Sequence, residues 1–466
     1  MRPGLLWRFW GAILEVVRES WRRSWAASLA AAASLLVPLA AGAAGSSAAR
    51  LAFVGIDDNI YECGGDCARP RCVTCRVQGT EARGAGARLV AFEQPQDDGA
   101  AKFAWPTYSP DGHRLACLSS GGKQGRPSYG VYVYDLDKMI STRIFESSTE
   151  RGIYLFWLPD RERLSFLVTE PDDRLTLMLA EARGDAPIRI VASGVPLYFD
   201  WNLKSELLLH TTVTGSGPAD RVSLMNVTPT SQDIERVLSR GNAPFKTPCW
   251  SPDGAHLAFV ASEDDIAHLY LADRDGRNPR AMTKLMVGES SFVWAPDSRH
   301  IAFATAQLPP HTVMDGVNLL DVGDGSVKRL VNDDVAAFYF SPDSKRIAYV
   351  TVPPEQPFYT WNVIDLRSGK SRQLGSFLTT NEETLAWHYF DQLALSHSIW
   401  APDSSAIAFA GLPIEKRWHG AIPRQPMDTP PPGVMILPID GGKPRRVADG
   451  VLAFWAPVNA PVATAP

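Results

Sequence analysis

A five-residue motif that begins with an aromatic residue recurs along this chain, and each copy precedes a short apolar stretch. The copy at Tyr108–Gly112 reads Tyr-Ser-Pro-Asp-Gly and precedes Leu115–Leu118. The copy at Trp250–Gly254 differs from it only in its first residue and precedes Leu257–Val260. Three further copies end in Ser instead of Gly, at 294–298, 340–344 and 400–404. Five copies of one unit predict a repeat architecture.

The chemistry of the motif predicts a tight turn between two strands. Pro presets φ for the first central position, Asp bonds to nearby main-chain groups, and Gly tolerates a positive φ. The flanking residues are aromatic and β-branched, which favours strands. A second polar turn follows Val131–Asp135, Leu269–Asp273 and Asn362–Asp365. Four antiparallel strands recurring at a spacing of roughly 40 to 60 residues are typical of a propeller blade.

Weaker copies and the two ends of the chain complete this pattern. Trp157–Asp160 and Phe199–Trp201 keep parts of the motif. Leu452–Pro457 resembles a first strand without partners, and Arg50–Val54 and Asn59–Glu62 resemble later strands without a first. We expect the two ends to complete one blade, because closure removes open sheet edges. The sequence predicts an all-β propeller of about eight four-stranded blades, or seven if Phe199–Trp201 belongs to an insertion.

Residues 50–457 resemble the TolB-type propeller repeat, a WD40-like family, through these motifs. The resemblance implies the fold. Propellers of this kind occur in envelope scaffolds, in the gating domains of prolyl-oligopeptidase and tricorn-type proteases, and in exported proteins of other kinds, so it implies no single function. TolB itself has six blades and an α/β domain before its propeller, whereas strands begin here almost directly after an apolar segment. The resemblance therefore does not extend to a role in the Tol system.

Composition agrees with one large all-β domain and excludes one class of partner. The 466 residues include 36 Gly and 36 Pro, which suits a turn-rich chain. The formal net charge is −5, whereas proteins that bind nucleic acid through its phosphates carry a basic surface. We therefore expect no nucleic-acid partner.

The first 49 residues differ from the rest of the chain. Five arginines precede the uncharged stretch 24–49, which is long enough for a membrane span of about 20 apolar residues. Ala41-Gly42-Ala43 offers a cleavage site of the signal-peptidase type. Residues 1–49 are thus predicted to form a hydrophobic helix, either a signal peptide or a membrane anchor. The propeller at 50–457 would be exported, periplasmic or otherwise extracytoplasmic, with a disordered tail at 458–466.

Four of the six cysteines lie within 13 residues, at Cys63, Cys67, Cys72 and Cys75. Four thiolates in a short loop can hold a tetrahedral Zn²⁺. Outside the cytoplasm two disulfides are favoured instead, and free thiols are the third alternative. We expect this loop to connect the last two strands of the closing blade, before a strand at 87–90. Cys117 and Cys249 are predicted to be buried apolar residues.

Catalytic motifs are absent from the sequence. It contains no Gly-x-Ser-x-Gly elbow, P-loop, His-Glu-x-x-His or dinucleotide fingerprint. Turn geometry alone explains the repeated Asp of the five motifs. The sequence therefore predicts a protein that is not an enzyme.

Two long connections near the last full blade are the strongest candidates for a binding surface. They span 377–397 and 412–433, and both contain the residue types that anchor protein interfaces. The alternative is that they are variable surface loops. The candidate partner-binding residues are Trp387, His388, Tyr389, Phe390, Arg417, Trp418 and His419.

The sequence thus favours a non-enzymatic protein-binding or assembly module of the cell envelope. Its partner would be a protein, and its N-terminal segment would contact the membrane. The alternative is a hydrolase-like enzyme with a site in the channel or in the loops of the last blade, where His388, His397 and His419 are the candidates for acid or base work. A purely structural propeller is the third possibility.

Overall fold

The structure is a computed structural model, and it describes residues 49–64, 67–75, 101–123, 126–212, 220–227, 233–240, 246–263, 266–285, 290–305, 313–352, 358–414 and 430–457. The chain divides into two compact units, Met1–Ala44 and Gly45–Pro466, and all described residues belong to the second. The predicted hydrophobic helix in 1–49, apart from Ala49, and the predicted tail at 458–466 lie outside the described residues. Within the described part, no helix has the length and apolar character needed to span a membrane.

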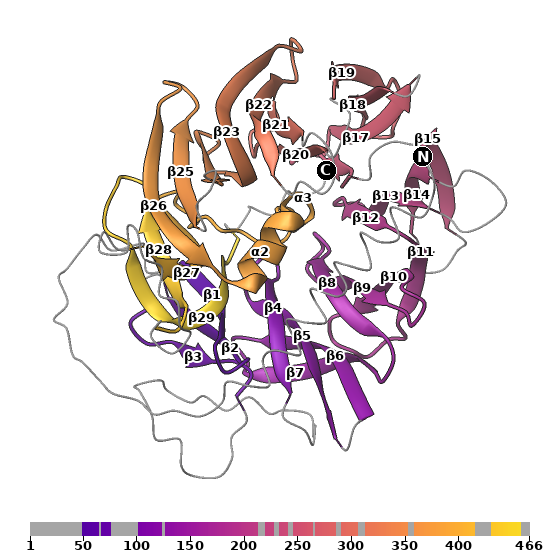
Figure 1. The fold of residues 1–466 in the computed structure, drawn as a ribbon. Coiled ribbons are helices and arrows are strands. Elements are labelled where there is room, and N and C mark those ends of the chain that lie inside the picture. The colour runs from indigo at the N-terminus through magenta and orange to yellow at the C-terminus, as the bar shows by residue number, and fades with distance from the viewer. Residues whose placement is uncertain are drawn as a thin grey trace. The chain divides into compact units, whose positions relative to one another are not determined.

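Four sheets each contain four antiparallel strands that pair with their neighbours along the chain (Figure 1). The first two sheets consist of β4 (Lys102–Tyr108), β5 (Arg114–Lys123), β6 (Arg126–Asp135) and β7 (Ile140–Ser147), and of β8 (Arg151–Trp157), β9 (Arg163–Thr169), β10 (Leu175–Glu181) and β11 (Arg189–Gly194). The next two consist of β12 (Leu197–Trp201), β13 (Glu206–Thr212), β14 (Asp220–Asn226) and β15 (Ile234–Arg240), and of β16 (Cys249–Trp250), β17 (His256–Glu263), β18 (Ile266–Asp273) and β19 (Arg280–Lys284).

The remaining strands form one continuous antiparallel series of thirteen. In order they are β20 (Ser290–Trp294), β21 (His300–Thr305), β22 (Met314–Asp321), β23 (Val327–Phe340), β24 (Arg346–Thr351), β25 (Tyr359–Asp365), β26 (Ser371–Thr379), β27 (Ala406–Pro413), β28 (Gly433–Pro438), β29 (Arg445–Trp455), β1 (Arg50–Gly55), β2 (Ile60–Gly64) and β3 (Arg71–Cys72).

Three strands of this series, β23, β26 and β29, each pair with strands of two groups of four. The first part of β23 pairs with β22, and its last part, from Val335, pairs with β24. Likewise, the first part of β29 pairs with β28, and its last part pairs with β1 in the register Phe53 to Ala453. Strands from the two ends of the described chain therefore lie side by side.

The first strands of successive groups lie next to one another, and this places the core between the sheets. β29 contacts β4, β4 contacts β8, and β12 contacts β16. The aromatic residue before the turn links neighbouring sheets as well: Trp157 Nε1 donates to the carbonyl of Thr107 (3.0 Å), and Trp400 Nε1 donates to that of Tyr339 (3.1 Å). The prediction of an all-β propeller is confirmed.

The repeated motif forms the predicted turn. Ser251 Oγ donates to Asp253 Oδ1 (2.6 Å) and accepts from the main-chain N–H of His256 (2.9 Å). Ser109 and Ser341 make the same pair of bonds. The fourth residue of each turn has a positive φ, whether or not it is glycine, in Gly112, Arg161, Ser205, Gly254, Ser298, Ser344 and Ser404.

The weak copy near Trp201 forms a regular sheet. Asn202 takes the place of the motif's Ser, and its Oδ1 accepts from the main-chain N–H groups of Lys204 (2.9 Å) and Glu206 (3.0 Å). β12 then pairs with β13 as the other first strands pair with their neighbours. Because an Asn side chain offers the same acceptor oxygen, the turn survives without the motif's sequence.

The segment before the last full group of strands was expected to be a long surface connection, and this expectation is wrong. It contains α2 (Asn381–His388) and α3 (Phe390–Leu393). Thr380 caps α2, because its Oγ1 accepts from the main-chain N–H of Glu383 (3.1 Å).

Candidate functional site

We call residues 380–397 the central segment. Its helices lie among the first strands of several sheets (Figure 1): α3 contacts β20, and α2 contacts β23 and β29. Thr380 Oγ1 also donates to the carbonyl of Val451 on β29 (2.7 Å). A single stretch of chain thus meets strands that are far apart in the sequence.

Gln392 on α3 pairs with the open edge of β12. Its Nε2 donates to the carbonyl of Phe199 (2.9 Å), and its Oε1 accepts from the main-chain N–H of Phe199 (3.2 Å). Phe199 is opposite Leu209 on β13. The carboxamide therefore bonds to the strand's free side as the peptide group of another strand would.

Tyr154 on β8 holds the same segment through its hydroxyl group. The hydroxyl donates to the carbonyl of Gln392 (3.0 Å), accepts from Gln392 Nε2 (3.2 Å) and lies 2.9 Å from Ser396 Oγ. Tyr154 and Gln392 are both buried. Three polar groups thus satisfy one another away from solvent, as buried polar groups must.

His397 ends the central segment in a buried position. Its Nε2 is 3.0 Å from Thr107 Oγ1 on β4, and its Nδ1 is 2.7 Å from Ser396 Oγ. The ring packs on Phe454 with the centroids 4.5 Å apart. Burial lowers the pKa of His397 to about 3, because the charged imidazolium is poorly solvated there.

Aromatic rings fix the helices of the central segment against β23 and β25. Phe390 packs on Phe338 with ring centroids 4.7 Å apart, and Trp387 packs on Tyr359 at 4.9 Å and on Trp361 at 6.3 Å. Edge-to-face pairs at these distances add to the stabilisation from burial.

Two carboxyl groups of the segment are buried with it. Glu383 Oε1 accepts from the main-chain N–H of Ala410 (2.7 Å), and Asp391 Oδ1 accepts from that of Gln392 (3.0 Å). Burial raises the pKa of Glu383 to about 8, a shift that the bond from Ala410 reduces. Burial also raises the pKa of Asp391, and the charge of Lys246 opposes that shift.

A third buried carboxyl group, Asp200 on β12, lies next to Phe199 in the chain. It accepts from the main-chain N–H groups of Trp201 (2.8 Å) and Trp250 (2.9 Å) and so connects β12 to β16. Burial raises the pKa of Asp200 to about 7, against the lowering effect of these two bonds. Sequence analysis did not find this residue, because Asp after an aromatic residue is common in loops and strand ends.

The predicted partner-binding residues divide into three groups. Trp387 and Phe390 are buried, with 3% and 1% of their surfaces exposed, so the expectation that they anchor a partner at the surface is wrong. His388 and Tyr389 are half-buried. Arg417, Trp418 and His419 lie outside the described residues.

One sequence signal could have revealed the helix. Thr380-Asn381-Glu382-Glu383 has the Thr-x-x-Glu pattern that marks helix N-termini. Here Thr380 makes the expected cap, whereas the Glu383 side chain bonds to Ala410 on β27 instead of returning to the cap residue.

Of the three histidines proposed for acid or base work, the structure describes two, His388 and His397. His397 is buried and bonded to hydroxyl groups, and its low pKa makes it a weak base near neutral pH. His388 is on α2, and His419 lies outside the described residues.

The clustered cysteines form two disulfides, Cys63–Cys67 and Cys72–Cys75, which corresponds to the disulfide alternative. Among the described residues no group of three or more His, Cys, Asp or Glu side chains is placed to hold a metal ion. The partner strand of β2 is β3, inside the cysteine cluster itself, and not a later strand. The expected strand at 87–90 lies outside the described residues.

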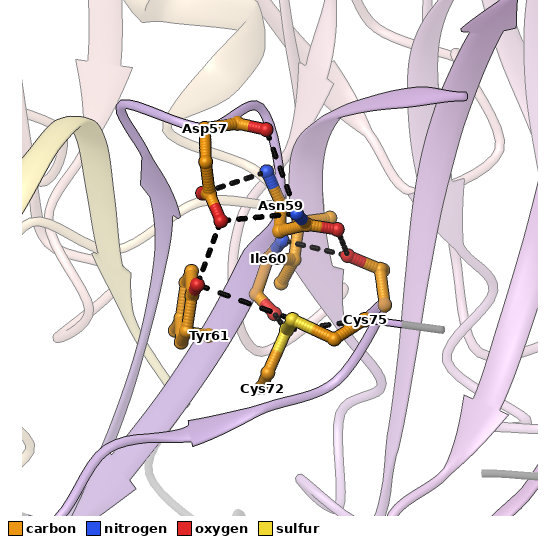
Figure 2. The surroundings of a disulfide bond; sticks show 7 residues. Asp57, Asn59, Ile60, Tyr61, Cys72 and Cys75 are labelled. Carbon is orange, nitrogen blue, oxygen red and sulfur yellow. Dashed lines mark hydrogen bonds between the residues drawn. A yellow bond between two sulfur atoms is a disulfide. The ribbon is translucent and has the colours of Figure 1, made fainter. Parts of the chain in front are cut away.

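Figure 2 shows how polar side chains surround Cys72–Cys75. Tyr61 donates its hydroxyl hydrogen to Asp57 Oδ2 (2.8 Å), and the same carboxylate accepts from Asn59 (3.0 Å). Thr74 Oγ1 accepts from the main-chain N–H of Ile60 (2.8 Å). These contacts tie the disulfide loop to the β1–β2 turn.

Glu62 lies on the other side of the same hairpin and is 4% exposed. It forms ion pairs with Arg71 (2.6 Å) and Arg50 (3.4 Å), and the hydroxyl of Tyr108 on β4 lies 3.5 Å from it. Arg71 also donates to the carbonyl of Leu136 (3.2 Å), so the hairpin is bonded to the next sheet.

Comparison with known proteins finds no family model that matches the chain. A stretch of 64 residues is 42% identical to the uncharacterized peptidase YuxL of Bacillus subtilis, over 14% of this chain and 10% of that protein. A stretch of 72 residues is 36% identical to echinoderm microtubule-associated protein-like 2 of Homo sapiens, over 15% of this chain and 11% of that protein. The chain thus spans about a tenth of the length of these relatives.

Solved structures extend the likeness over most of the chain. A prolyl endopeptidase structure matches with a TM-score of 0.51 and 12% identity, over 76% of this chain and 50% of that one. An oligogalacturonate lyase in complex with manganese matches at 0.46 and 16%, over 71% and 87%, and TolB from Acinetobacter baumannii at 0.38 and 17%, over 74% and 83%. At 12% identity the likeness to the prolyl endopeptidase structure concerns the fold alone.

Proposed function

We propose that the chain is a closed propeller of eight four-stranded blades and that it works as a non-enzymatic protein-binding or assembly module of the cell envelope. The blade count is supported by four separate sheets of four strands and by four further groups within the series of thirteen, which meet at β23, β26 and β29. Closure is supported by the pairing of β29 with β1.

The observation that carries the binding function is the occupation of the centre by the chain's own central segment. The polar side chains there are hydrogen-bonded within the fold: Gln392 to Phe199, Tyr154 to Gln392, and His397 to Thr107. Polar groups that are satisfied in this way position a scaffold, and the low pKa of His397 makes its ring a weak base for proton transfer.

The envelope location is supported by the two disulfides. Disulfides persist in oxidising compartments such as the periplasm and the extracellular space. The predicted signal peptide or anchor in 1–49 would deliver the chain there and contact the membrane. This localisation is testable by fractionation and by thiol labelling of the intact cell.

The partner would bind at the connection 412–433, through Arg417, Trp418 and His419. Arg and Trp are among the residue types that contribute most to protein interfaces. Of the other predicted residues, Trp387 and Phe390 are buried in the core, and His388 and Tyr389 are half-buried.

A pull-down from envelope extract tests this function. The variant Arg417→Ala/Trp418→Ala should recover at least tenfold less of each specific partner than the wild type does, as measured by quantitative mass spectrometry. Arg183→Ala/Ile190→Ala, at exposed positions in the β10–β11 turn and on β11, is the matched control and should keep them. Identical partner profiles for both variants and the wild type would contradict the proposed surface.

The alternative is a hydrolase-like enzyme with its site at the centre. The observation that favours it is the contact of 2.7 Å between Ser396 Oγ and His397 Nδ1. A fluorophosphonate probe that labels the wild type but not Ser396→Ala would support this alternative and count against the binding module.

A further inference from the structure

The contacts of Gln392 have a chemistry that a partner could reproduce. Its carboxamide makes one donor and one acceptor bond with the same residue of β12, Phe199. A peptide group in an extended chain presents the same pair of atoms to a strand edge. The open edge of β12 is therefore already shaped to accept an amide, and α3 occupies it in this structure.

The segment that occupies this edge is short and has few local interactions of its own. α3 has four residues and no side chain that caps its N-terminus. Its polar contacts are with Tyr154 on β8 and Phe199 on β12. The energy that holds it in place thus comes from docking, which can be reversed, and not from helix propagation.

Docking also carries a cost. It buries the carboxyl groups of Glu383 and Asp391, and no ion pair to either is formed within the described part of the chain. Burying ionisable groups with so few partners opposes docking. A segment that served only to fill the core would be more stable with apolar residues at these positions.

We propose that the central segment is a displaceable occupant of a binding site at the edge of β12, and that an extended peptide of a partner protein takes the place of Gln392 there. The peptide offers a main-chain peptide group or a side-chain carboxamide to the main chain of Phe199, and a hydrogen-bond acceptor to the Tyr154 hydroxyl. This inference rests on the proposed protein-binding function and names the chemistry of one of its contacts.

The test uses the full chain and a labelled peptide with the chain's own sequence 387–397, whose binding is followed by fluorescence anisotropy. In the wild type the intramolecular segment competes with the peptide. Gln392→Ala removes the bonds to Phe199, and Tyr154→Phe removes those of the hydroxyl while keeping the ring. Gln373→Ala, an exposed glutamine on β26, is the matched control.

We expect Gln392→Ala to bind the peptide at least tenfold more tightly than the wild type and the control do. Apparent affinity rises with the fraction of molecules whose site is open. Tyr154→Phe should bind it no more tightly than the wild type, because the hydroxyl bond is lost to the segment and to the peptide alike. A peptide that carries Ala in place of its own glutamine should bind at least tenfold more weakly.

Equal binding by all four proteins, or no binding by any, would overturn the proposal. So would a joint loss of cooperative thermal unfolding in Gln392→Ala and Tyr154→Phe, because the segment would then be a fixed part of the core. The experiment involves no envelope partner, so its failure is distinct from the failure of the pull-down.

Discussion

The repeated turns and the central segment use carboxyl groups in opposite ways. In the turn of Asp253, burial acts to raise the pKa, but the hydrogen bonds from Ser251 and from the main chain outweigh it and lower the pKa. Asp111 and Asp343 behave in the same way. In the central segment the balance is reversed, because burial dominates and raises the pKa of Glu383 and Asp391.

This difference separates two kinds of stabilisation. A turn carboxylate is ionised and satisfied by atoms within five residues of chain, so its own hydrogen bonds are local, although the main-chain N–H of Asp253 also donates to Ser298 Oγ of the next turn (3.0 Å). The carboxyl groups of the central segment depend on strands that are distant in sequence, such as β27 for Glu383. The turns therefore shape each blade, whereas the central segment couples different blades.

The largest expected effect is in the packing of the central segment. Phe390→Ala should lower the free energy of unfolding by about 3 to 5 kcal/mol, because it empties a fully buried site beside Phe338. Chemical denaturation measures the change. Ile190→Ala, at a position 64% exposed, is the control and should change stability by less than about 0.5 kcal/mol. A loss for Phe390→Ala no larger than that of the control would contradict the burial of the ring.

The second prediction concerns pH. Because the folded-state pKa values of Asp200 (about 7) and Glu383 (about 8) are raised, the folded state binds more protons than the unfolded state above pH 4, and stability falls as pH rises. From pH 5 to 7 the loss should be about 2 to 3 kcal/mol per group. The turn carboxylates, with lowered pKa values, add stability that is lost only below about pH 4.

Substitution tests which carboxyl groups cause this dependence. Asp200→Asn and Glu383→Gln should each flatten the decrease in melting temperature between pH 5 and 7, and Asp185→Asn, at an exposed position, should not. If the stability of the wild type stays constant or increases between pH 5 and 7, the carboxyl groups of Asp200 and Glu383 are not buried as described.

The third prediction addresses one turn. Ser251→Ala removes the hydroxyl that donates to Asp253 and accepts from the main chain of His256, so it should cost about 1 to 2 kcal/mol. Urea denaturation measures the change. The reverse substitution, Ala295→Ser in a copy that lacks the hydroxyl, is the companion variant and should be neutral or stabilising. A cost as large as that of Phe390→Ala would show that the turns are not local units.

The smallest expected effect is in the backbone of a turn. Arg161 has a φ of 70°, so Arg161→Gly should stabilise the protein by less than about 1 kcal/mol through relief of left-handed strain. Gly254→Ala should act in the opposite sense and cost about 1 kcal/mol, because Gly254 has a φ of 68° and nothing lies within 4 Å of an added Cβ. Opposite signs in thermal unfolding are the expected outcome, and equal signs would contradict this backbone account.

The same contrast explains what could be predicted from the sequence. The turns and strands were predictable because each motif contains all the atoms that its turn needs, as Ser251 and Asp253 illustrate. Even the copy at Asn202 follows the rule once an equivalent acceptor is allowed. The all-β propeller fold follows from such local units.

The central segment was not predictable in this way. Trp387 and Phe390 are residue types that are also common in exposed binding loops. They are buried because strands that are distant in the sequence pack on them. Gln392 has no sequence pattern that names Phe199 as its partner. The cysteine spacing likewise permitted both zinc and disulfides, because the choice depends on redox environment and on the fold of the β2–β3 hairpin.

Native-state hydrogen exchange of the wild-type chain, resolved to short peptides, tests the central claim most directly. The account holds that the central segment docks reversibly on the blades and can leave them without global unfolding. It predicts that the amides of residues 381–396 exchange together, at least a hundredfold faster than those of β12 and β13 and more slowly than those of exposed turns. Exchange of the segment at the same rate as β12, by global unfolding alone, would contradict it.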